Sequence, residues 1–200
     1  MGYLNKKNWI VEQIEYSIAK NLIQKLHYTG SCSNTATFCF GLFCKKNYTL
    51  SGVSMWMNAP AGVSKKYGNG KMNDVLTLSR FVLIPDLPTN SASFLLGSSM
   101  KKISKTNKYS CLVTYADSSQ NHNGIIYTAT NWIYSGTTMG ATQWVDSFGN
   151  SISSLSTKSI PIEQMRKKYT QMPKTRKKIF VFPLTIKKRL ENHQRQLKLF

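Results

Sequence analysis

Residues 75–97 read VLTLSRFVLIPDLPTNSASFLLG, and this stretch decides the fold class. Val75–Ile84 is almost continuously apolar, which is typical of a central strand that is buried on both faces. Two prolines then break the chain, and Asn90 or Ser91 provides an N-cap for a helix that runs to about Lys102. The stretch therefore predicts a buried strand, a turn and a helix in direct succession.

The rest of the chain repeats this alternation of strands and helices. Hydrophobic periodicity and turn residues predict the flanking elements. Upstream these are an amphipathic helix over residues 10–26 that stops before Gly30, a hairpin of Thr35–Cys44 and Tyr48–Met57, and a loop at Ala61–Asn73. Downstream they are a strand at Lys108–Ala116, a polar turn at Asp117–Asn123, a short helix at Gly124–Asn131 and a strand at Trp132–Thr137. These are followed by a hairpin at Gln143–Ile152 that turns at Ser147–Asn150, and by a helix opened by Pro161. The last strand is expected at Ile179–Thr185, where Pro183 indicates an edge or a bulge.

This order predicts an α/β fold with a mixed sheet and crossover helices. A chain of 200 residues fits a single domain. We expect residues 1–186 to form that domain and residues 187–200 to form a basic C-terminal helix or tail.

The chain is strongly basic. It contains 27 Lys and Arg against 8 Asp and Glu, which gives a formal net charge of +19. Like charges oppose compaction, so the excess indicates a polyanionic partner, and nucleic acid is the first candidate. Residues 165–200 are the densest part, with 12 basic residues and one acid, Glu191. A generically basic protein without such a partner is the plainer alternative.

The cysteines and the hydropathy indicate the cellular compartment of the protein. Cys39 and Cys111 lie in apolar, strand-like runs, where a reduced cysteine behaves as a small hydrophobe. A zinc cluster of Cys32, Cys39, Cys44 and His27 has a spacing that fits no standard finger. No signal peptide and no 18-residue apolar run is found, so we expect a cytoplasmic protein without a membrane partner.

Polar side chains lie at or near the ends of the two central strands. Ser79 and Arg80 interrupt the first strand. Burying polar side chains there costs free energy unless they take part in an interaction, so a functional role is indicated. Asp117 follows the second strand, and Tyr127 lies on the next helix. Ligands of open α/β sheets bind at the carboxyl ends of the strands, and a helix N-terminus attracts anions. We predict an anionic cofactor at the Asn90–Ser93 turn, near Asp117 and Tyr127; ordinary packing with a simple N-cap is an equal alternative.

Four stretches in a fixed order carry a resemblance to a known family. LSRFVLIPDLPTNSASFLLG (78–97) combines a strand ending in Ser-Arg with a Pro-x-Asn-Ser turn, and YSCLVTYADSSQNHNGIIYTATNWIYSG (109–136) contains Ala-Asp and Gly-x-x-Tyr-x-Ala-x-Asn. Upstream stands His-Tyr-Thr-Gly (27–30), and downstream KKIFVFPL (177–184). Together, over roughly residues 25–190, they resemble the Mom family of phage DNA-modification proteins.

The resemblance implies a GNAT-like fold, a central mixed sheet flanked by helices. In that fold acetyl-CoA or a related acyl-CoA lies in the splay between two central strands, with its pyrophosphate at the next helix N-terminus. Ser79, Asn90, Ser91 and Ser93 would then bind the cofactor. The usual phosphate loop, Gln/Arg-x-x-Gly-x-Gly/Ala, is replaced here by LPTNSA (87–92), so side chains would take the place of glycine backbone.

The resemblance also implies an activity. Mom proteins alter the N6 amino group of adenine in phage DNA with a carbamoylmethyl-type adduct, in the host cytoplasm, and this blocks restriction endonucleases. By this resemblance Asp117 is a general base or orients the amine, Arg80 anchors a phosphate or carboxylate, and Tyr127 donates a proton to a leaving thiolate. His27 and Tyr28 would line the acceptor pocket.

Two of these assignments have structural alternatives. Asp117 could instead be the N-cap of the following helix. Arg80 could instead form a buried pair with an acid such as Asp74. Iron has also been proposed for the family, and His27, Asp117 and His122 are candidate ligands, although their spacing does not show it.

An amino group in a stacked duplex is generally reached by base flipping, which needs a basic surface and aromatic wedges. The residues that we predict to contact double-stranded DNA are Lys45, Lys46, Lys65, Lys66, Tyr67, Arg166, Lys167, Lys168, Arg176, Lys177 and Lys178. Candidate wedges are Tyr28, Trp56, Trp132, Tyr134 and Trp144. For Trp132 and Phe180 core packing is the preferred interpretation, whereas Tyr28 and Tyr67 favour a functional role.

Two other functions stay open at this point. One is a GNAT-type acyltransferase that acts on a protein, an RNA or a small amine. The other is a non-catalytic, basic DNA-binding protein. The oligomeric state is open as well, with a dimer as one alternative.

Overall fold

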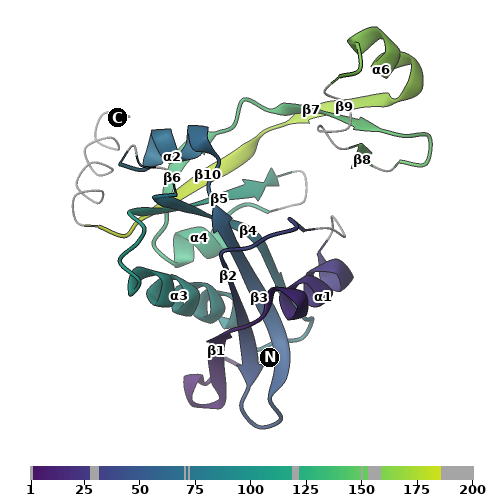
Figure 1. Ribbon diagram of the computed structural model, residues 1–200. Coiled ribbons are helices and arrows are strands. Elements are labelled where there is room, and N and C mark those ends of the chain that lie inside the picture. The colour runs from purple at the N-terminus through teal and green to yellow at the C-terminus, as the bar shows by residue number, and fades with distance from the viewer. Residues whose placement is uncertain are drawn as a thin grey trace.

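The main sheet of the computed structural model has seven strands in the order β1-β2-β3-β4-β5-β10-β6 (Figure 1). The structure describes residues 2–27, 32–69, 71, 73–118, 122–149, 151–152 and 159–185. The strands are β1 (Trp9–Gln13), β2 (Phe38–Cys44), β3 (Thr49–Asn58), β4 (Val75–Leu83), β5 (Cys111–Asp117), β10 (Lys177–Pro183) and β6 (Ile133–Thr137). All neighbours are antiparallel except β4 and β5, which are parallel. The predicted mixed sheet is confirmed.

Helices cover both faces of this sheet. They are the 3-10 turn η1 (Lys6–Asn8), α1 (Tyr16–Leu26), α2 (Ala61–Tyr67), α3 (Ser91–Ser104) and α4 (Ile125–Ala129). On one face, Ala19 and Ile23 of α1 pack with Val53 and other side chains of the sheet. On the opposite face, Leu95 and Leu96 of α3 pack on the sheet. Successive residues of a strand point to opposite faces, so these central strands are apolar at nearly every position.

A smaller sheet, β8-β7-β9, extends from the main one (Figure 1). It comprises β7 (Ala141–Val145), β8 (Ser151–Ile152) and β9 (Thr170–Thr175), and α6 (Ile162–Lys168) lies at its far end. We call residues 138–176 the arm. The arm continues from β6 and returns directly into β10, and the predicted hairpin over residues 143–152 is confirmed within it.

Two predictions for the N-terminal half are wrong in part. The helix expected over residues 10–26 begins only at Tyr16, because Trp9–Gln13 pairs with β2 as an edge strand. The loop expected at Ala61–Asn73 contains α2, whose Ser64 and Tyr67 are three positions apart and are both buried. In both cases tertiary packing overrides the local signal, which was helical apolar periodicity in the first case and glycine content in the second.

The last strand is displaced by two residues from the expected range, and β9 was not expected at all. Strand β10 begins at Lys177, two residues early, and Pro183 lies beyond the last residue that pairs with β6. Strand β9 contains Pro173 and few apolar residues, so hydrophobic alternation does not reveal it. The predicted basic tail over residues 187–200, and Tyr28 with residues 29–31, lie outside the described residues.

Candidate functional site

Strands β4 and β5 separate part of the way along their length. They pair only through Val75–Thr77 of β4 and Cys111–Val113 of β5. Beyond that point β4 stays paired with β3 and β5 stays paired with β10, so the two backbones diverge (Figure 1). A wedge therefore opens in the middle of the sheet, at the carboxyl ends of its parallel strands, where ligands of α/β proteins bind.

A β-bulge lies on the β4 side of this wedge. Met55 of β3 is opposite Arg80, but the next residue, Trp56, is opposite Leu78, so Ser79 is the extra residue of β4. The Ser79 hydroxyl donates to the Met55 carbonyl oxygen at 3.1 Å. Bulges redirect side chains and often lie beside active sites. The polar pair that interrupts the apolar strand is thus placed at the wall of the wedge.

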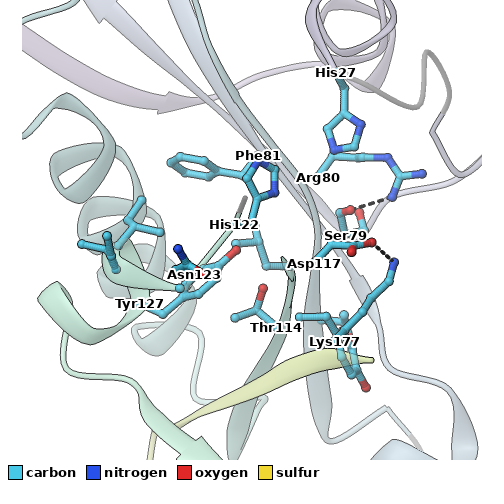
Figure 2. A pocket seen from close by; sticks show the side chains of 16 residues that line it. His27, Ser79, Arg80, Phe81, Thr114, Asp117, His122, Asn123, Tyr127 and Lys177 are labelled. Atoms are coloured by element: carbon cyan, nitrogen blue, oxygen red, sulfur yellow. Dashed lines mark hydrogen bonds and ion pairs between the residues drawn. The ribbon is translucent and has the colours of Figure 1, made fainter. Parts of the chain in front are cut away.

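A cavity of about 550 Å³ occupies the wedge. Its wall is built from both diverging strands, the end of α1, the loop before α4, and the start of β10 (Figure 2). The lining residues are His27, Thr77, Leu78, Ser79, Arg80, Phe81, Thr114, Tyr115, Asp117, His122, Asn123, Gly124, Ile125, Ile126, Tyr127 and Lys177. Its volume lies in the range of small-molecule sites.

Asp117 forms an ion pair in this cavity. It is the last residue of β5, and its Oδ2 lies 3.0 Å from Nζ of Lys177, directly opposite on β10 (Figure 2). The carboxylate is largely buried, whereas the lysine is partly exposed. Helix α4 begins after Gly124, so Asp117 is not its N-cap. The cavity thus holds one buried carboxylate that can accept a proton.

His27 is held neutral by its surroundings. It caps the C-terminus of α1, where its N–H donates to the carbonyl oxygen of Ile23 at 2.8 Å. Burial, as the largest cause, and electrostatic repulsion from Arg80, His122 and Lys177 together lower the pKa of its imidazole from 6.5 to about 4. The cavity is therefore electropositive, and His27 can act there as an uncharged donor or acceptor.

Arg80 faces the same space. Its Nη1 donates to the carbonyl oxygen of Ser79 at 2.7 Å, which holds the guanidinium group beside the bulge. The alternative pair with Asp74 is wrong, because Asp74 lies at the other end of β4. There its carboxylate accepts hydrogen bonds from the Ser110 hydroxyl at 2.6 Å and the Asn69 N–H at 2.8 Å.

The wall opposite Arg80 is the start of α4. Gly124 has a φ of +82°, and a Cβ there would lie 2.3 Å from Phe180. Only glycine combines this left-handed backbone with such close packing. Tyr127 lies one turn later, with its ring 5.2 Å from that of Phe180 and 5.7 Å from that of Trp132. The tyrosine ring is therefore fixed by packing at the cavity wall.

Thr77 lies at the apex of the wedge, where β4 and β5 part. Its side chain is buried and lines the cavity, and its Oγ1 has no hydrogen-bond partner among the described residues. Leaving a buried hydroxyl unpaired costs about 1–3 kcal/mol, and such groups in native proteins often have a functional explanation. The sequence offered no signal for Thr77, since a threonine in a central strand is ordinary.

Only one of the four predicted cofactor residues lines the cavity. Ser79 lines the cavity, whereas Asn90, Ser91 and Ser93 lie at the start of α3 and are not among its lining residues. The Ser91 hydroxyl donates to the carbonyl oxygen of Pro88 at 2.7 Å. Thr89 pairs with the N-terminal segment, through hydrogen bonds to Leu4 and Gly2. The helix start is therefore engaged by the protein's own groups.

The predicted aromatic contacts with DNA require correction. Tyr67 is buried, packs with Val75 and Val113, and accepts a hydrogen bond from the Ser135 hydroxyl at 3.3 Å, so it does not present a surface for a base. Trp56, Trp132 and Trp144 are buried as well, whereas Tyr134 is exposed. Core packing of Trp132 and Phe180 is confirmed.

The predicted basic contacts lie mostly at the surface. Lys45 and Lys46 follow β2, Lys65 and Lys66 lie on α2, and the remaining ones lie on the arm or at the start of β10. All are exposed except Lys177 and Lys178, which are partly buried. Lys177 belongs to the cavity rather than to the open surface, which its sequence context of consecutive cations did not reveal.

The described residues show no metal site and no membrane-spanning helix. No group of three His, Cys, Asp or Glu side chains among them is arranged to hold a metal ion, so the candidate iron ligands gain no support. The same finding covers Cys32, Cys39, Cys44 and His27, all of which are described, so the zinc alternative gains no support either. In the part of the chain that the structure describes, no helix is long and apolar enough to cross a membrane.

Comparison with known proteins identifies both the family and the fold. A model of the Mom protein family matches residues 8–197. The search of curated proteins gives no match. The structure is similar to ribosomal-protein-S18-alanine N-acetyltransferase from Escherichia coli, with 11% identity, a TM-score of 0.54, and coverage of 89% of this chain and 95% of that chain.

Two further solved structures are similar over nearly their whole length. One is ribosomal-protein-S5-alanine acetyltransferase from Vibrio fischeri, with 8% identity, a TM-score of 0.55, and coverage of 92% of this chain and 97% of that one. The other is spermidine N-acetyltransferase from Vibrio cholerae in complex with CoA and spermine, with 7% identity, a TM-score of 0.52, and coverage of 89% and 96%. Similarity at these identities establishes a GNAT acetyltransferase fold and nothing finer.

Proposed function

We propose that this chain, which belongs to the Mom protein family, is a transferase that modifies the N6 amino group of adenine in DNA with a carbamoylmethyl-type adduct. The observation that carries the proposal is the buried, ion-paired Asp117 in an electropositive cavity of an acetyltransferase fold. Family membership supports adenine as the target, and the net charge of +19 supports a nucleic-acid substrate.

The chain's own residues can manage the protons of such a transfer. The adenine N6 amine is a poor nucleophile, and it must lose one proton as its new bond to carbon forms. Asp117 accepts that proton, with Lys177 holding the carboxylate in place at 3.0 Å. The Tyr127 hydroxyl donates a proton to the departing group, so the net proton count is unchanged. His27 and Arg80 position the base and the donor.

Acetyl-CoA or a related acyl-CoA is the proposed donor: the amine would attack its thioester carbon and CoA would leave as the thiol, which yields an acyl group on N6. A carbamoylmethyl group is joined to N6 through its methylene carbon and contains an amide nitrogen, so it would require a donor that supplies both. The wedge fits the reactive arm of this cofactor, because the bulge at Ser79 and the unpaired Thr77 hydroxyl line it. The helix start that would meet the phosphates has no glycine loop, and the Ser91 hydroxyl is already engaged. The N–H of Ser91 is also engaged, by the Pro88 carbonyl oxygen, so Asn90 and the N–H groups of Ala92 and Ser93 are the groups left to hold phosphate there.

The shape of the site requires the adenine to leave the duplex. The carboxylate lies inside a cavity within the sheet, and an adenine that is stacked and paired cannot bring its N6 to that depth. A flipped base would enter between His27, at the end of α1, and the start of α4. Protection against restriction endonucleases would follow from the bulky group on N6, where those enzymes read the major groove.

The direct test is nucleoside mass spectrometry of DNA from cells that express the chain. We expect a mass-shifted adenine nucleoside with wild-type protein and none with Asp117→Asn. The mass identifies the group, since acetyl and carbamoylmethyl adducts differ. An unmodified adenine pool from cells that contain folded wild-type protein would contradict the proposal.

A second candidate is acyl transfer to another amine. It is supported by the similar structures, whose names give an alanine of a ribosomal protein and spermidine as acceptors. The same cells distinguish the two: acylated protein, RNA or polyamine alongside unmodified adenine would favour this alternative.

A further inference from the structure

The arm begins at the rim of the cavity. Strand β9 ends at Thr175, and two residues later Lys177 forms the ion pair with Asp117. On the other strand of the arm, the N–H of Thr138 donates to the Lys177 carbonyl oxygen at 2.9 Å, and the Lys177 N–H donates to Oγ1 of Thr138 at 3.0 Å. Both strands of the arm are thus anchored to a residue of the site.

The charge of the arm is suited to a polyanion. Residues 138–176 contain six Lys or Arg and only two acids, Asp146 and Glu163. Three of these cations, Arg166, Lys167 and Lys168, form the last turn of α6, and all three are exposed. Helix α6 lies at the end of the arm that is farthest from the main sheet (Figure 1).

The arm also exposes apolar side chains. Phe148 is 88% exposed, although its turn is ordered by hydrogen bonds from the N–H groups of Phe148 and Gly149 to Asp146, at 2.9 and 3.0 Å. Met139 is 93% exposed. Exposed apolar groups on a basic element fit a nucleic acid, which offers phosphates and base or sugar edges together. A second copy of this arm would bring like charges together, which disfavours self-association.

We infer that the arm is a second DNA-contact surface, which grips the duplex to one side of the target adenine. The inference rests on the proposed function, because it takes duplex DNA as the substrate. The last turn of α6 binds backbone phosphates, and Phe148 makes an apolar contact in a groove.

The length of the arm sets where that contact falls. Strand β9 has six residues, which span about 20 Å at 3.3 Å per residue. At 3.4 Å per base step this corresponds to about six base pairs. The arm therefore contacts the duplex about five to seven base pairs from the adenine, and on one side only.

Binding of labelled duplex at several salt concentrations tests the phosphate contact. The variant Arg166→Ala/Lys167→Ala/Lys168→Ala removes three cations from the end of α6. The matched control, Lys101→Ala/Lys102→Ala/Lys105→Ala, removes three exposed cations from the end of α3, which lies far from the arm in Figure 1. We expect the arm variant to lose about 10- to 100-fold in affinity and its salt slope to fall by about two to three, and the control to stay within about threefold of wild type.

Two further measurements separate the parts of the contact. Phe148→Ser removes no charge, so we expect an affinity loss of about 3- to 10-fold without a change in salt slope. A duplex with a single A·T pair tests the reach of the arm. Trimming the flank that the arm contacts to three base pairs should weaken DNA binding by the wild type and leave the affinity of the arm variant unchanged. Trimming the other flank should change the affinity of neither protein.

The outcomes separate this inference from the proposed function. Wild-type affinity and salt slope in the arm variant, while wild-type protein modifies adenine in cells, would overturn the arm's role and leave the proposed function standing. If the wild type is a dimer that the arm substitutions dissociate while DNA binding stays unchanged, the arm is a self-association surface. That result would also overturn the inferred DNA contact. Unmodified adenine with intact arm-dependent binding would overturn only the chemistry.

Discussion

The cavity and the arm meet at Lys177, yet they are built in opposite ways. The cavity lies inside the main sheet, where strand register, a bulge and close aromatic packing fix each polar side chain. In the arm, Trp144 and Met165 are buried, whereas Phe148 and the described cations Arg166, Lys167, Lys168 and Arg176 are exposed. Chemistry requires groups held within a fraction of an ångström, whereas holding a phosphate backbone requires charge and reach.

This contrast predicts that the two regions fail differently when they are altered. Substitutions in the cavity should remove modification or stability without loosening DNA. Substitutions on the arm should loosen DNA without changing the pocket. The variants below test that separation, in order of decreasing effect.

Asp117→Asn should have the largest effect. It keeps the shape of the side chain but removes the proton acceptor, so we expect modification of adenine to fall by about 10²- to 10⁴-fold, as measured by nucleoside mass spectrometry. DNA affinity should stay within about twofold of wild type. The matched control is Asp86→Asn, an exposed acid with a left-handed φ of 61°, which asparagine tolerates well.

Activity near wild type in folded Asp117→Asn protein would remove Asp117 from the reaction. A large loss of DNA affinity in that variant would show that cavity and arm are not separable.

Gly124→Ala should destabilise the protein by about 2–4 kcal/mol, measured by denaturant unfolding. Alanine there is strained at a φ of +82°, and its Cβ would meet Phe180. Gly97→Ala is the control, since a Cβ at this position in α3 has no atom within 4 Å. That change should be neutral or stabilise the helix by up to about 1 kcal/mol. Equal stability of the two variants would refute the close packing behind α4.

His27 should make stability depend on pH in a defined window. Its pKa is about 4 in the folded protein, against 6.5 when unfolded, so the unfolded chain binds more protons between these values. Stability is therefore lost as the pH falls from about 6.5 to about 4, and is unaffected by this group above 6.5. Because His27 is partly exposed, we expect about 1–2 kcal/mol over the window after allowing for solvent screening.

The variant His27→Gln should lack this part of the pH dependence, as measured by unfolding at pH 4.5 and pH 7. Parallel stability curves for the variant and wild type would show that His27 is not held neutral by burial.

Thr77→Val should produce the smallest change, and its sign is diagnostic. The substitution removes a buried hydroxyl that has no partner among the described residues, so we expect a gain of about 1 kcal/mol in unfolding free energy. If that hydroxyl binds the donor, modification should fall by about tenfold in the same variant. A loss of stability, or a gain without loss of activity, would show that Thr77 serves only the fold.

Local patterns in the sequence predict well the part of this molecule that contains the cavity. The apolar run at Val75–Ile84 and its polar interruption forecast β4, and the ends of β4 and β5 do bring Ser79, Arg80, Asp117 and Tyr127 to one cavity. These side chains follow from strand order, because neighbouring parallel strands end together.

The features that the sequence did not predict depend on contacts between distant segments. In the sequence Lys177 is indistinguishable from the surface lysines beside it, and only the register of β10 against β5 places it beside Asp117. The bulge at Ser79 depends on the pairing of β4 with β3. Tyr67, which is flanked by lysine and glycine, looks exposed in the sequence but is buried when α2 packs on the sheet.

The most direct test compares modification and DNA binding in three proteins: wild type, Asp117→Asn, and Arg166→Ala/Lys167→Ala/Lys168→Ala. Nucleoside mass spectrometry of cellular DNA gives the first quantity, and titration of a labelled duplex gives the second. We predict modified adenine with wild type, none with Asp117→Asn at unchanged affinity, and reduced modification with the arm variant in proportion to its reduced affinity. Unmodified adenine with folded wild-type protein, or full modification by Asp117→Asn, would contradict the assignment of the cavity as the site of adenine chemistry.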